Sequence, residues 1–187
     1  MSANTPHTTG AYAAASSWQR PLYSASAVCV GWYALILASL HAHPGAGVRD
    51  AALALHLLSL ALGFGAVLAV DAMGLAVLLG WARVERLLAF SARADRLIWG
   101  GFVGLAVSGV WLRPDFSSGW TAVNFVAVLV AALNGVFAHA LRTGVPPQLR
   151  TRPWHDLPPS LLWRGCAAAL VSQAAWWTSI LVGSLTS

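Results

Sequence analysis

Long apolar runs separated by short polar breaks dominate the pattern of this chain. The runs cover approximately residues 24–40, 52–81, 97–112, 120–141 and 161–184. A transmembrane helix needs about 20 mostly apolar residues, whereas a strand of a membrane barrel needs only about 10. Backbone amides inside the bilayer find no water, so a spanning segment must be a helix or part of a closed barrel. The lengths of the runs therefore predict an all-α bundle of about five transmembrane helices.

The breaks between the runs carry turn signals. Residues 43–47, 113–115 and 145–160 contain proline, often beside glycine or aspartate, which is typical of turns and loops. Residues 82–96 mix apolar and charged positions. We expect this segment to form an amphipathic extension of the second helix beyond the bilayer.

The distribution of charge predicts the orientation of the bundle. Residues 1–23 are rich in Ser, Thr and Ala and lack the basic segment of a signal peptide, so we expect a polar N-terminal tail before a transmembrane domain over 24–187. If this tail lies inside, only Arg49 and Arg113 face outward. The other arginines then face the cytoplasm: Arg20, Arg83, Arg86, Arg93, Arg96, Arg142, Arg150, Arg152 and Arg164. Because cytoplasmic loops are enriched in basic residues, we predict that the N-terminus is inside and the C-terminus outside.

The same arginines indicate the partner. They lie between apolar runs and not along one face of a soluble helix, so the pattern indicates a lipid bilayer and not a nucleic acid. In the third run, Gly100 and Gly104 form an edge of small residues where a second helix can approach closely. That helix belongs either to this bundle or to another membrane subunit.

Ionisable residues inside a span are costly and therefore mark candidate functional sites. One is His56, toward the outer side, where His41 and His43 also end the first run. Two imidazoles are enough for haem b, and neutral imidazole also binds copper or zinc. Gly63 and Gly65 follow His56 along the helix and leave room for a flat macrocycle. The alternative is that His41 and His43 are solvated and His56 bonds a neighbouring helix.

Asp71 and His139 form a second candidate site on the inner side. From a helical rise of about 1.5 Å per residue, Asp71 lies ~7 Å and His139 ~12 Å inward of the midplane on parallel helices. We expect an ion pair or hydrogen bond between them. Asn134, Ser172 and Gln173 fall near the same level, and we expect them to fix helix packing through hydrogen bonds.

The second run resembles that of a known group. The residues Leu55-His56-Leu57-Leu58-Ser59, followed by Gly63-Phe64-Gly65 and Asp71, resemble small multi-pass proteins of the bacterial inner membrane related to the copper-resistance CopD and protoporphyrinogen-oxidase HemJ types. Ser108-Gly109 and Asn134-Gly135 with His139 extend the resemblance over residues 52–140. It implies haem b as cofactor, with a membrane histidine, here His56, as ligand.

Three functions follow from these features. The leading hypothesis is a haem b-binding membrane protein for electron transfer or redox sensing. The alternative is a non-catalytic accessory subunit of a larger respiratory or photosynthetic membrane complex. A weaker hypothesis is an ion or metal permease. The chain has no phosphate-binding loop, and Gly63-x-Gly65 lies within an apolar run and not after a strand, so the sequence indicates no soluble-enzyme chemistry.

Overall fold

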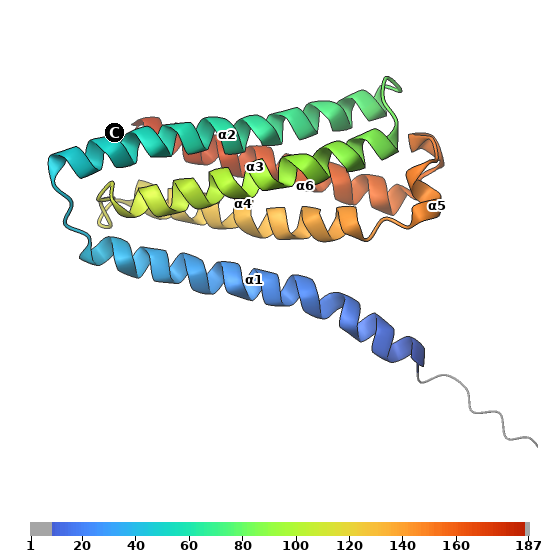
Figure 1. Ribbon diagram of the computed structural model, residues 1–187, viewed down its shortest axis with the longest axis horizontal. Coiled ribbons are helices and arrows are strands. Elements are labelled where there is room, and N and C mark those ends of the chain that lie inside the picture. Colours follow the sequence, from blue (N-terminus) through green and yellow to red (C-terminus); the bar gives the residue numbers. More distant parts are fainter. Residues whose placement is uncertain (1–8, 186–187) are drawn as a thin grey trace, which may run out of the picture.

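The protein folds as a bundle of long helices (Figure 1). The computed structural model describes residues 9–185, and over this range it contains helices and no strand. The helices are α1 (Thr9–His41), α2 (Ala46–Leu78), α3 (Val84–Val110), α4 (Gly119–Thr143), the short α5 (Pro147–Arg150), the 3₁₀ helix η1 (Trp154–Asp156) and α6 (Pro159–Leu185). The predicted all-α class is confirmed.

Four segments of the described chain are long and apolar enough to cross a membrane: Gln19–His41, Ala46–Leu78, Gly119–Thr143 and Pro159–Leu185. By the length and composition of these helices, the chain is a multi-pass membrane protein. The expected fifth span falls on α3, which has 27 residues and therefore measures about 40 Å. The first half of α3 carries several charged residues, so its composition differs from that of the other long helices.

The turn between α2 and α3 corrects the prediction for residues 82–96. The segment does not extend α2, because α2 ends at Leu78 and Gly80 adopts a left-handed conformation with φ of 77°. The amide of Gly80 donates to the Val77 carbonyl and that of Trp81 to the Ala76 carbonyl, which is the hydrogen-bond pattern of a Schellman motif. The chain therefore reverses, and residues from Val84 onward begin α3.

The start of α1 also differs from the prediction. The helix begins at Thr9, well before residue 24, where the apolar run begins. Alanine is the strongest helix former, and four of the five residues at 11–15 are alanine. Part of the expected polar tail, residues 1–8, lies outside the described residues.

Two helix pairs make up most of the bundle. α2 packs along α3, and α4 packs along α6, while α2 meets α6 and α3 meets α4 over shorter stretches. α1 lies at the edge against α4 and α3 (Figure 1), where the Trp32 ring is 6.4 Å from that of Phe102 and 5.6 Å from that of Phe125. Any space inside the bundle therefore lies between the two pairs.

Small residues hold α2 and α3 close together. A Cβ added at Gly101 would lie 2.5 Å from Gly63 Cα and 2.7 Å from the Ser59 carbonyl oxygen, so the two backbones touch. One turn along, Gly104 faces the Ser59 side chain. Gly100 has no neighbour within 4 Å of such a Cβ. Gly104 thus serves packing inside this chain, whereas Gly100 faces open space.

Two apolar clusters join the pairs at different heights. The central cluster consists of Phe64, Val67, Leu105 and Trp176, and its Phe64 and Trp176 rings stack with centroids 5.6 Å apart. The end cluster consists of Val77, Val84 and Leu157. It lies at the end of the bundle that contains the α2–α3 turn and residues 144–158, which we call the α5 end. The stretch between the two clusters is where the site lies.

Candidate functional site

A pocket of about 550 Å³ separates the two helix pairs between the central and end clusters. It is lined by residues of α2, α3, α4 and α6, from Val67 and Trp176 at the central cluster to Val77 and Leu157 at the end cluster. The walls are mainly apolar, and the pocket is partly open to its surroundings. Pockets of this volume, between helices and with few polar groups, are typical of small-molecule sites.

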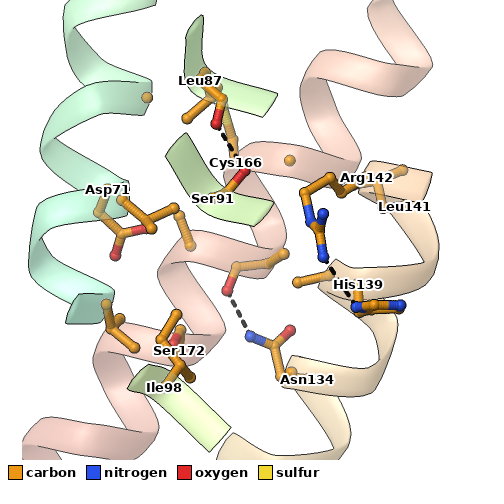
Figure 2. Close-up of a pocket in the computed structure, with 18 of the residues that line it drawn as sticks. Asp71, Leu87, Ser91, Ile98, Asn134, His139, Leu141, Arg142, Cys166 and Ser172 are labelled. Atoms are coloured by element: carbon orange, nitrogen blue, oxygen red, sulfur yellow. Dashed lines mark hydrogen bonds between the residues drawn. The ribbon is translucent and has the colours of Figure 1, made fainter. Parts of the chain in front are cut away.

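Polar side chains enter this pocket from all four helices (Figure 2). They are Asp71, Ser91, Asp95, Asn134, His139, Arg142, Cys166 and Ser172. In Figure 2, Asp71 comes from α2 on one side, and His139 and Arg142 from α4 on the opposite side. The pocket thus joins an apolar interior to polar groups on its walls.

The most concentrated polar group is the triad of Asp95, His139 and Arg142, which links α3 to α4. Asp95 Oδ2 lies 2.7 Å from His139 Nδ1 and 2.5 Å from Arg142 Nη2. A carboxylate only accepts hydrogen bonds, so His139 Nδ1 carries the proton that faces it. The Arg142 side chain is 17% exposed and that of Asp95 24%, whereas that of His139 is 50% exposed. The triad therefore forms part of the rim of the pocket.

Asp71 and His139 line the same pocket but have different partners. Gln173 Nε2 of α6 donates to Asp71 Oδ2 over 2.6 Å, and His139 bonds Asp95 of α3. The expected direct bond between Asp71 and His139 is therefore not the arrangement found. The physical reason is the order of the helices, because α2 packs along α3 and meets α6 over a short stretch, whereas its contact with α4 is smaller still.

The other polar residues expected at this level join helices. Asn134 Nδ2 donates to the Ala168 carbonyl over 2.7 Å and so ties α4 to α6. Gln173 Oε1 accepts from Trp177 Nε1 over 3.1 Å, which orients its amide toward Asp71. Ser172 lines the pocket. The predicted packing role of Asn134 and Gln173 is confirmed.

At the other end of the bundle, His56 contacts α3. Its Nδ1 lies 2.9 Å from Ser108 Oγ. The Ser108 hydroxyl has one proton and lies 2.6 Å from the Gly104 carbonyl, to which it donates. Ser108 therefore accepts from His56 Nδ1, which carries the ring proton. In the neutral imidazole, Nε2 then keeps a free lone pair.

The other outer histidines do not join His56 in a ligand cluster. His41 Nδ1 bonds the Leu37 carbonyl of its own helix over 2.8 Å, and His43 is exposed. Within residues 9–185, no group of three or more His, Cys, Asp or Glu side chains is placed to hold a metal ion. The space expected beside Gly63 is filled by the backbone of Gly101, whereas Gly65 faces open space.

Two members of the triad were not singled out from the sequence. Asp95 and Arg142 read as ordinary charges outside the bilayer, between other arginines. The sequence does contain a signal for Asp95, because it is an acidic residue close to Arg93 and Arg96. That signal indicates a residue inside the bundle only once α3 is known to begin at Val84.

Comparisons with known proteins give no family for this chain. No protein-family model, no curated protein and no solved structure matches it. The resemblance to the CopD and HemJ types therefore stays a prediction.

Proposed function

We propose that this protein binds a lipid-soluble ligand, with an apolar body and a polar head, in the pocket between its two helix pairs. The observation that carries the proposal is the pocket of about 550 Å³, whose mainly apolar wall includes the Asp95–His139–Arg142 triad. Its volume lies in the range of about 300–1,000 Å³ that is usual for ligand sites.

The shape of the bundle supports access from the bilayer. α2 meets α6, and α3 meets α4, over short stretches, and the pocket is partly open. A ligand dissolved in the membrane reaches such a site between helices without crossing water. The polar head of the ligand then forms hydrogen bonds with the triad. An acyl chain of a bulk lipid has no polar group to form them.

Native mass spectrometry of protein purified from membranes tests this proposal. We expect a retained small-molecule adduct in the unmodified protein and its loss in Gly74→Phe, since Gly74 lines the pocket and a Cβ there meets nothing within 4 Å. Gly65→Phe is the matched control on the same helix, because Gly65 is equally open but does not line the pocket. An adduct that is absent, or equal in both variants, contradicts the proposal.

The orientation of the bundle is part of the proposal. We place the α5 end in the cytoplasm and count α3 as a fifth span, because nine arginines then lie inside and two outside. A variant lacking Cys29 and Cys166 allows the test. A cysteine at Ser117 should react with an impermeant maleimide in intact cells, whereas one at Thr151 should not. The reverse pattern inverts the orientation.

Haem b at His56 is a second candidate function, for electron transfer or redox sensing. The bond from His56 Nδ1 to Ser108 favours it, because ligand histidines commonly donate their second ring nitrogen to a protein acceptor. Protein purified after haem supplementation should show a Soret band that His56→Ala removes and His139→Ala leaves. Absence of the band, or a band unchanged by His56→Ala, rejects this candidate.

A further inference from the structure

A second cavity of about 470 Å³ adjoins the ligand pocket at the α5 end. Arg142 and Leu88 line both cavities, so these two side chains form the wall between them. The second cavity, which we call the arginine groove, is also lined by Glu85, Thr143 and Arg150. A molecule with its body in the pocket has its head within reach of this groove.

The arginine groove contains hydrogen-bond donors that the described contacts do not use. Arg142 is engaged through Nη2, which donates to Asp95 Oδ2. Arg150 is engaged through Nε, which donates to the Val145 carbonyl over 3.1 Å. The remaining guanidinium nitrogens therefore keep donors for a ligand. Two planar guanidinium groups lining one hollow are suited to the oxygens of a phosphate.

The charges around the groove favour an anionic head. Two arginines line it against the single carboxylate of Glu85. Asp95 lies on the pocket side of Arg142, where it holds the guanidinium in place by an ion pair. Further exposed arginines, Arg83 and Arg86, lie nearby in sequence at the start of α3. The apolar pocket, which can hold a hydrocarbon tail, thus lies beside the cationic arginine groove, with Arg142 between them.

We propose that the ligand is a phosphate-bearing lipid, with its hydrocarbon tail in the pocket and its phosphate in the arginine groove between Arg142 and Arg150. This inference rests on the proposed function and adds the chemical class of the head. Arg150 lies outside the pocket, so it contributes to recognition of the phosphate and not of the tail.

Binding of two simple probes to the full chain in detergent tests the inference. Hexadecyl phosphate and hexadecanol share a tail and differ in the phosphate. We expect the phosphate to bind more tightly than the alcohol. Arg150→Gln should weaken binding of hexadecyl phosphate by about tenfold, the value for loss of a charge-assisted hydrogen bond, and leave hexadecanol binding unchanged. Arg152→Gln is the matched control, because Arg152 is exposed and does not line the groove.

Three other outcomes would contradict either the phosphate inference or the proposed function. Equal affinity for the two probes, or equal effects of Arg150→Gln and Arg152→Gln at unchanged melting temperature, overturns the phosphate inference and leaves the pocket proposal standing. Inorganic phosphate that binds as tightly as hexadecyl phosphate overturns the link between groove and pocket. If neither probe binds, the proposed function itself fails.

Discussion

The contact between Gly63 and Gly101 makes the sharpest prediction about the bundle. We expect Gly101→Ala to lower stability, because the new Cβ would lie 2.5 Å from Gly63 Cα, 2.6 Å from Gly63 N and 2.7 Å from the Ser59 carbonyl oxygen. All three atoms belong to the backbone, so no side-chain rotation relieves the overlap. α2 and α3 must therefore separate where Gly63 and Gly101 meet.

The size of the effect follows from the cost of overpacking. One extra methyl group in a well-packed core typically costs about 1–3 kcal/mol. For a chain of this length, each kcal/mol changes the melting temperature by roughly 2–4 °C, so a fall of roughly 2–12 °C is expected. Tryptophan fluorescence during heating in detergent measures it. Gly100→Ala is the control, since nothing lies within 4 Å of its Cβ and alanine favours the helix by up to about 1 kcal/mol. Equal melting temperatures for the two variants would refute the close contact.

Three further predictions concern polar bonds between helices, each measured by the same thermal assay. Asp71→Leu should destabilise the protein more than Asp71→Asn by about 1 kcal/mol, because leucine leaves the Gln173 amide without an acceptor. Adding Gln173→Leu to Asp71→Leu should recover part of the loss, and purely additive effects would mean that Asp71 and Gln173 do not interact. Asp95→Leu should cost about 1–3 kcal/mol by leaving Arg142 unpaired, and an unchanged melting temperature would show that the ion pair does not form. Ser108→Ala should cost about 1 kcal/mol by removing the acceptor for the α2 imidazole, whereas Ser184→Ala, on the exposed end of α6, should cost less.

Hydropathy predicted much of the fold, because spanning length is set by the bilayer and is visible in the sequence. Four of the five runs fall on α1, α2, α4 and α6. The end of α2 was wrong, since the run continues to residue 81 while the helix stops at Leu78. The helix stops because Gly80 adopts a left-handed backbone conformation, and a hydropathy pattern does not predict backbone dihedral angles.

The sequence led us to expect Asp71 and His139 near one another, and both line one pocket without bonding to each other. Their hydrogen bonds go to Gln173 and Asp95, because the lateral order of helices decides which side chains meet. Spacing along one helix determines depth and face, but it contains no information on which helix lies opposite. The glycines of α2 show the same limit, since only the bundle reveals that Gly63 faces α3.

Photo-crosslinking with a diazirine-bearing alkyl probe tests the central claim, that the pocket holds a lipid-soluble ligand, most directly. Peptide mapping separates labels that excess unlabelled ligand removes from labels that persist. We expect removable labels on pocket residues such as Val67, Ile98 and Ala169, and persistent labels on exposed apolar residues outside the pocket, such as Leu57 and Leu181. Labels that all persist, or that are confined to the outer surface of the bundle, would contradict this claim.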